Sequence, residues 1–86
     1  MQIENSIKKI LVNELFVEVP EAEMGLDDGL QTVFGLDSLG FVELRFQCEQ
    51  TFGVQISDEY FDNKNFSSIR TVANLIQELQ AMQTAK

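Results

Sequence analysis

The sequence contains no histidine, no tryptophan, one cysteine and one proline among its 86 residues. A catalytic centre that pairs Ser or Cys with His is therefore impossible within this chain. A zinc site is disfavoured for the same reason, because such sites are built mainly from Cys and His. A single cysteine cannot form an internal disulfide, so nothing in the sequence indicates an oxidising compartment.

Basic residues are also few: six Lys and Arg stand against fourteen Asp and Glu, which gives a formal net charge of −8 at pH 7. Such a chain repels phosphate backbones, so we expect no nucleic-acid partner. It is instead attracted to basic surfaces on other proteins. The chain also lacks the ~20 consecutive apolar residues of a membrane span, and its first residues do not resemble a signal peptide. We therefore expect a cytoplasmic protein without membrane insertion.

The apolar pattern predicts a single all-α domain over residues 1–86. Apolar residues recur at helical spacing over 3–17, 38–52 and 68–83, which we expect to form three main helices. Residues 57–62 are expected to form one short helical turn. The expected fold is thus a bundle of three main helices plus one short helix, with a long first loop.

The expected first loop, residues 18–37, carries most of the net negative charge. Pro20 and several Gly and Asp residues interrupt the helical pattern here. Residues 14–37 contain seven acids and no base. Loops of this length in a small domain are usually functional or packed by their own side chains. At the later helix starts, Ser57 and either Ser67 or Ser68 are candidate caps.

The second predicted helix has two apolar stripes. With 100° per residue, the two stripes are centred roughly 150° apart. The first consists of Phe41, Leu44, Cys48 and Phe52, and the second of Leu39, Val42 and Phe46. In a thin domain only one stripe has a full set of core partners, so the second is expected to be partly exposed and to bind other proteins. The alternative is a central helix that is buried on both sides.

Cys48 belongs to the first stripe, so we interpret it as a small core residue and not as a reactive thiol.

The run Asp37-Ser38-Leu39 stands where the long loop meets this helix. For such a run alone, the simplest interpretation is that Asp37 or Ser38 caps the helix. A hydroxyl at a helix N-terminus is also well placed to carry a phosphate, because free N–H groups and the positive end of the helix dipole favour an anion.

Together, this motif, the length, the acidic charge and the helix pattern resemble the acyl carrier protein family. The resemblance covers nearly the whole chain, through the runs Gly35-Leu36-Asp37-Ser38-Leu39, Val42-Glu43-Leu44, Phe52-Gly53-Val54 and Ile69-Arg70-Thr71-Val72. It implies a monomeric carrier without catalytic activity of its own.

The resemblance also implies the role of individual residues. Ser38 would be the attachment point of 4′-phosphopantetheine, transferred from coenzyme A by a separate phosphopantetheinyl transferase with Mg²⁺. The thiol of that arm would hold acyl groups as thioesters. The motif residues Asp37 and Leu39 would assist recognition. The implied partner contacts are Leu39, Val42, Glu43, Phe46, Glu49 and Phe61, facing acyl-loading enzymes, ketosynthases or other acyl-processing enzymes.

The chain also departs from the pattern of primary fatty-acid carriers. Gly40 stands where an acid usually follows the motif, and the helix contains Arg45 and only two acids. These differences favour a discrete carrier in polyketide or related specialised biosynthesis. Peptidyl carriers usually have Gly directly before the motif serine. This chain has Asp37 at that position, which favours an acyl cargo. Primary fatty-acid synthesis and an aminoacyl or peptidyl cargo remain alternatives, and an unmodified acidic helical interaction module is the alternative from another class.

Overall fold

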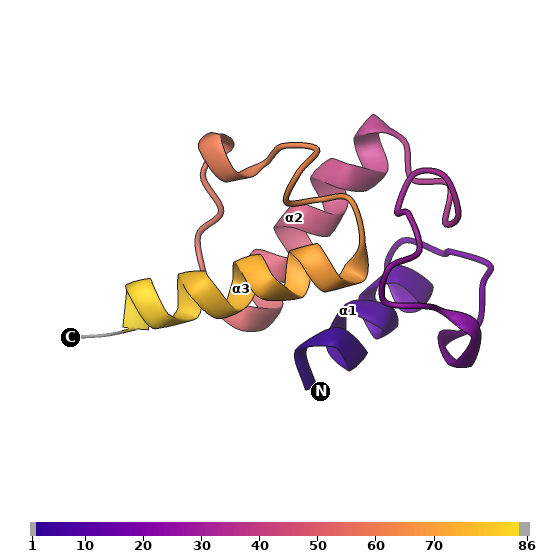
Figure 1. Cartoon of the computed structure of the whole chain (residues 1–86), viewed down its shortest axis with the longest axis horizontal. Helices are drawn as coiled ribbons and strands as arrows, with labels where there is room; N and C mark the ends of the chain where they lie inside the picture. The colour runs from indigo at the N-terminus through magenta and orange to yellow at the C-terminus, as the bar shows by residue number, and fades with distance from the viewer. Residues whose placement is uncertain (1, 85–86) are drawn as a thin grey trace.

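The computed structural model describes residues 2–84 and has the predicted all-α architecture (Figure 1). Its elements in chain order are α1 (Gln2–Asn13), the 3₁₀ turn η1 (Glu21–Glu23), α2 (Ser38–Phe52), the 3₁₀ turn η2 (Asp58–Tyr60) and α3 (Ile69–Thr84). Within the described residues, extended pairing is limited to one isolated bridge between Gly29 and Ser68. None of these helices combines the length and hydropathy of a membrane-spanning segment.

The three long helices pack on one another around one core, with α3 in contact with both α1 and α2. The long first loop contributes to this core, because Met24, Leu30, Phe34 and Leu36 are buried in it. The fully buried side chains from the helices are Ile7, Leu11, Leu44, Cys48, Ile69, Val72, Ile76 and Leu79. The loop is therefore a packed part of the fold, which fixes the position where α2 begins.

The predicted range 3–17 for the first helix is wrong at its end, because α1 ends at Asn13. The N–H groups of Leu15 and Val17 donate to the carbonyls of Ile10 and Leu11, so the chain turns back on the last helical turn. Between them, Phe16 has φ 59, in the left-handed region that terminates a helix. Leu15 and Val17 continue the apolar spacing, which is why the sequence pattern extends beyond the true end.

α2 has the predicted range 38–52, because both of its ends carry local signals. The carboxylate of Asp37 accepts the Gly40 N–H at 2.8 Å, so Asp37 and not Ser38 is the cap. At the other end Gly53 has φ 67, and its N–H donates to the Glu49 carbonyl. A glycine adopts this left-handed conformation without steric cost.

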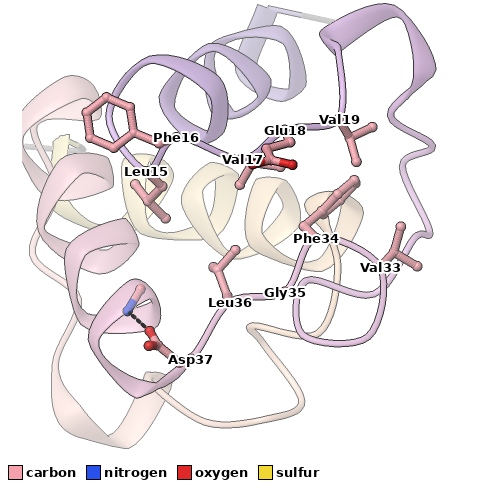
Figure 2. A pocket seen from close by; sticks show the side chains of 11 residues that line it. Leu15, Phe16, Val17, Glu18, Val19, Val33, Phe34, Gly35, Leu36 and Asp37 are labelled. Carbon is pink, nitrogen blue, oxygen red and sulfur yellow. Dashed lines mark hydrogen bonds between the residues drawn. The ribbon is translucent and has the colours of Figure 1, made fainter.

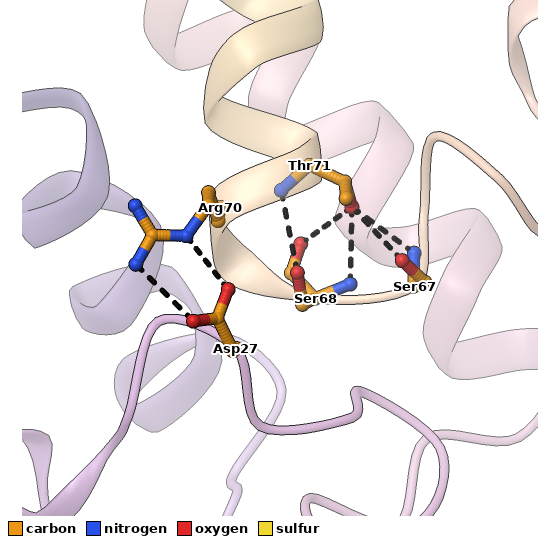
Figure 3. Close-up of polar contacts among 5 residues, drawn as sticks. All are labelled: Asp27, Ser67, Ser68, Arg70 and Thr71. Carbon is orange, nitrogen blue, oxygen red and sulfur yellow. Dashed lines mark hydrogen bonds and ion pairs between the residues drawn. The ribbon is translucent and has the colours of Figure 1, made fainter.

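Polar contacts join the first loop to the start of α3 (Figure 3). The Arg70 guanidinium donates to both carboxylate oxygens of Asp27, at 2.6 and 3.2 Å. Of the two predicted caps, Ser68 takes the role: its hydroxyl accepts the Thr71 N–H, while the Thr71 hydroxyl accepts the Ser68 N–H. The two side chains thus satisfy each other's backbone donors at the helix start.

The short turn η2 is smaller than the predicted range 57–62. Ser57 stands at its start as predicted but makes no side-chain capping bond. A three-residue turn has few free N–H groups to cap, and η2 is instead held to α2 by side-chain contacts described below.

Candidate functional site

Ser38 is the first residue of α2 and is exposed. Because Asp37 supplies the cap, the hydroxyl of Ser38 is not required to hold the helix start. The first N–H groups of a helix lack partners in the helix itself. Within residues 2–84, the N–H groups of Ser38 and Leu39 meet no protein acceptor. The geometry therefore presents a free hydroxyl beside free N–H donors at the positive end of a 15-residue helix.

The backbone before Ser38 is fixed by the turn at 29–36. Gly35 has φ 74, and the Leu36 N–H donates to the Leu30 carbonyl at 3.0 Å. The side chain of Leu36 is buried. This anchor holds the chain directly before the motif, so Asp37 and Ser38 emerge from a rigid base and not from a free loop.

Gly40 lies close to that anchor. A Cβ at this position would be 3.3 Å from both the Asp37 carboxylate and the Leu36 side chain. The absence of a side chain therefore lets the Asp37 cap close over the first turn of α2 without displacing Leu36.

Two pockets flank this first turn. One, of ≈ 250 Å³, is lined by Ser38 and, from α2 and the η2 region, by Phe41, Val42, Phe61, Asp62, Asn63 and Phe66. The other, of ≈ 530 Å³, includes Asp37 and Gly40 and opens toward the end of α1 (Figure 2). Of these two, only the smaller one includes Ser38 among its lining residues.

The two predicted stripes of α2 differ in burial as expected. Leu44 and Cys48 are fully buried, and Phe41 and Phe52 pack against the core. In contrast, Leu39 is 79% exposed, Val42 54% and Phe46 51%. The helix is thus not buried on both sides, and its second stripe is open to solvent.

The two acids beside the stripe are both held by intramolecular bonds. Glu43 accepts a hydrogen bond from the Gln47 amide at 2.7 Å, one helical turn further on. Glu49 accepts the N–H of Ile56 at 2.8 Å, which fastens the segment after α2. Glu49 therefore has a structural contact that the sequence does not reveal, and its contact with partners stays a prediction.

Phe61 is half-buried and held from two sides. Its ring meets that of Phe66 edge to face at 5.0 Å, and the Arg45 guanidinium lies 4.9 Å from the ring centre. Arg45 also pairs with Asp58 at 2.9 Å. Sequence reasoning missed this role of Arg45, because the contact joins residues whose proximity depends on the fold.

Cys48 is unsuited to thioester chemistry. Its side chain is fully buried. Burial raises the pKa of the Cys48 thiol from its ordinary value of 9.0 to about 12, and the neighbouring Glu49 carboxylate adds to this effect. The reactive thiolate is therefore scarce at neutral pH.

Comparisons with known proteins agree on one family. The family model described as "Phosphopantetheine attachment site" matches residues 7–79. The curated acyl carrier protein of Solidesulfovibrio magneticus is 32% identical over 78 residues, which cover 91% of this chain and 95% of that protein. The chain belongs to the acyl carrier protein family.

Solved structures share the fold. The solution structure of a holo acyl carrier protein from Nitrosomonas europaea superposes with a TM-score of 0.78 at 19% identity, covering 91% of this chain and 95% of that one. A chain in the complex of Bradyrhizobium japonicum glycine:[carrier protein] ligase with glycylated carrier protein has a TM-score of 0.67 at 26% identity, covering 85% and 97%. The all-α bundle is therefore that of an acyl carrier protein.

The prosthetic group of this carrier family is covalently attached 4′-phosphopantetheine. The start of α2 fits such a group in two respects. The Ser38 hydroxyl is exposed, and the unpartnered N–H groups beside it suit a phosphate.

Proposed function

We propose that this carrier holds its 4′-phosphopantetheine on Ser38 and delivers acyl thioesters to the enzymes of a specialised, polyketide-type pathway. The observation that supports the attachment site most strongly is the division of roles at the start of α2. Asp37 caps the helix, which leaves the Ser38 hydroxyl exposed and without a structural task.

Attachment would join the Ser38 oxygen to the phosphorus of the phosphopantetheine moiety of coenzyme A as the phosphoanhydride bond breaks. The nucleotide part of coenzyme A leaves, and the serine proton passes to a base of the transferase. The chain supplies the nucleophile and the N–H groups beside the phosphate, while the transferase and Mg²⁺ supply the catalysis. The arm, once bound, provides the thiol that holds the acyl group.

The chain's own part in each later reaction is presentation. A tether raises the effective concentration of its cargo at the active site of whichever enzyme has docked. We propose, as the membership of the acyl carrier protein family suggests, a monomeric and cytoplasmic carrier without catalysis of its own that acts with a phosphopantetheinyl transferase and with acyl-processing enzymes.

The exposed stripe Leu39, Val42 and Phe46 is the proposed partner surface on α2. Glu43 and Glu49 lie beside it, and Phe61 borders the pocket that includes Ser38. A moderate apolar contact next to acids suits partners that must bind in turn and then be released.

An aminoacyl cargo is the second candidate, and one comparison favours it. The glycylated carrier in complex with a glycine:[carrier protein] ligase resembles this chain at 26% identity. Asp37, where peptidyl carriers usually have Gly, supports an acyl cargo instead. Incubation of the holo chain with ligases that activate fatty acids or glycine, followed by intact-mass measurement, separates the two. We expect loading with a fatty acyl group, and loading with glycine alone would contradict the acyl assignment.

The attachment itself is tested with coenzyme A, Mg²⁺ and a promiscuous phosphopantetheinyl transferase. The wild-type chain should gain one phosphopantetheinyl mass, and Ser38→Ala should gain none. If a known carrier is modified in the same reaction while this chain is not, the carrier assignment gives way to an unmodified interaction module.

A further inference from the structure

A groove of ≈ 530 Å³ lies between the segment after α1 and the turn at 29–36 (Figure 2). Its inner side chains, Leu15, Val17, Phe34 and Leu36, belong to the core or pack against it. The two large apolar residues at the rim, Phe16 and Val33, do not pack against the core. Phe16 is 79% exposed and Val33 is 50% exposed.

Phe16 is also unfavourable where it stands. Its φ of 59 belongs to the left-handed region, which Gly or Asn adopts most readily and which is rare for a bulky residue. A glycine would end α1 with less strain, and the exposed ring contributes little to the core. Neither the backbone conformation nor the packing therefore favours a phenylalanine here, and the exposed ring at the edge of a groove is a candidate contact for another protein.

The negative charge around the groove favours a positively charged occupant. Glu18 and Asp37 line it, and residues 14–37 contain no base. Elsewhere in this segment Glu21 pairs with Lys9 and Asp27 with Arg70, whereas Glu18 has no ion-pair partner within residues 2–84. The groove therefore combines apolar side chains with polar atoms, and no ion pair within residues 2–84 neutralises the carboxylate of Glu18 at its rim.

We propose that this groove is a second protein-docking surface, which accepts an apolar side chain flanked by Lys or Arg on a partner enzyme. A second copy of the chain would bring its own charge of −8 against these acids, and anionic lipid or nucleic acid would be repelled as well. Asp37 and Gly40 line the groove, so a partner seated there lies next to Ser38. This surface is distinct from the exposed stripe of α2 and does not depend on modification of Ser38.

The test uses the full, unmodified ¹⁵N-labelled chain and a synthetic amphipathic peptide with Leu on one helical face and Lys on the other. We expect the peptide to shift the backbone amide signals of residues 15–19 and 33–37. Phe16→Asn should weaken the affinity at least tenfold. Met82→Asn, which removes an apolar side chain of comparable exposure on α3, should leave it unchanged.

Asparagine tolerates the left-handed conformation, so Phe16→Asn should unfold at no lower denaturant concentration than the wild type. Should that variant prove less stable, Phe16→Gly gives the same readout with a residue that adopts this φ freely. Glu18→Lys should also weaken binding, and more so at low salt.

Three outcomes would overturn the proposal. One is the absence of any binding at low salt, and another is a shift pattern confined to Leu39, Val42 and Phe46. The third is an unchanged affinity in the folded Phe16 variant. Each is independent of whether Ser38 accepts phosphopantetheine, so the two proposals fail separately.

Discussion

At the scale of single residues, Asp37 and Ser38 divide the two tasks available at a helix start. The sequence alone leaves open which of them caps α2, because both residue types are good caps. The structure assigns the cap to Asp37 through its 2.8 Å bond to the Gly40 N–H. The simplest interpretation of the motif, a cap by Asp37 or Ser38, is thus confirmed for Asp37, and Ser38 makes no capping bond within residues 2–84.

The burial of Cys48 gives a prediction about thiol chemistry. A thiol reagent at pH 8 should find no reactive thiol in the folded apo chain and one in the holo chain, from the arm. Denaturant should expose one further thiol, that of Cys48, in both the apo and the holo chain. Rapid labelling of Cys48 in the folded apo chain would contradict the assignment of this residue to the core.

The same burial sets a direction for stability at high pH. The folded pKa of Cys48 is raised to about 12 from an ordinary value of 9.0. In this interval the unfolded state binds fewer protons, so Cys48 should lower the free energy of unfolding as the pH rises above 9.0. Denaturant titrations of the wild type and Cys48→Ala measure this effect. The wild type should lose more stability than the variant over that pH range.

At the scale of elements, the sequence predicts best where the signals are local. The bounds of α2 follow from Asp37 at one end and Gly53 at the other, and both residues act within one turn of the helix. The end of α1 is wrong by four residues, because a left-handed Phe16 has no composition signal and the apolar spacing continues past it. Local residue types therefore fix helix ends, and apolar spacing alone does not.

Contacts between elements lie outside such reasoning. From the sequence, Arg45 only makes α2 less acidic. In the structure it contacts the ring of Phe61 and forms an ion pair with Asp58, which holds both residues against that helix. Arg70 binds Asp27 across 43 positions of sequence. These pairs depend on how helices and loops are oriented in space, which charge and periodicity do not specify.

The exposed stripe of α2 gives the prediction at this scale. Val42→Asp or Phe46→Asp should lower kcat/KM of partner enzymes by about tenfold, equal to ~1.4 kcal/mol, while far-ultraviolet circular dichroism stays at the wild-type level. The control Met82→Asp changes an exposed apolar residue of α3 and should affect neither quantity.

A buried comparison completes this experiment. Leu44→Asp places a carboxylate in the core and should unfold the domain, because an unpaired buried charge is strongly destabilising. If Val42→Asp lost helical content as Leu44→Asp does, the stripe would be core and not a partner surface.

At the scale of the whole molecule, the charge of −8 is unevenly distributed. Most of it lies in the first loop, whereas α2 has only Glu43 and Glu49, both of them engaged in hydrogen bonds. We therefore expect the overall field to attract basic enzymes from a distance, and the proposed contacts on α2 and at the loop groove to decide which of them stay bound.

Association with a basic partner should therefore depend on salt. We expect kcat/KM for phosphopantetheinylation to fall by about tenfold between low salt and ~0.5 M NaCl, since screening shortens the range of the field. Glu18→Gln together with Glu23→Gln should reduce this dependence. A rate that does not change with salt would exclude electrostatic steering by the first loop.

The central claim is that Ser38 is the residue that carries the arm, and peptide-level mass spectrometry tests it most directly. Trypsin cleavage after Lys9 and Arg45 releases the segment 10–45, in which Ser38 is the only serine. After reaction with coenzyme A, Mg²⁺ and the transferase, fragmentation of this peptide should place one phosphopantetheinyl group on Ser38, and Ser57→Ala should be modified to the same extent as the wild type. A group found on any other residue, or a Ser38→Ala chain that still gains it, would contradict the account.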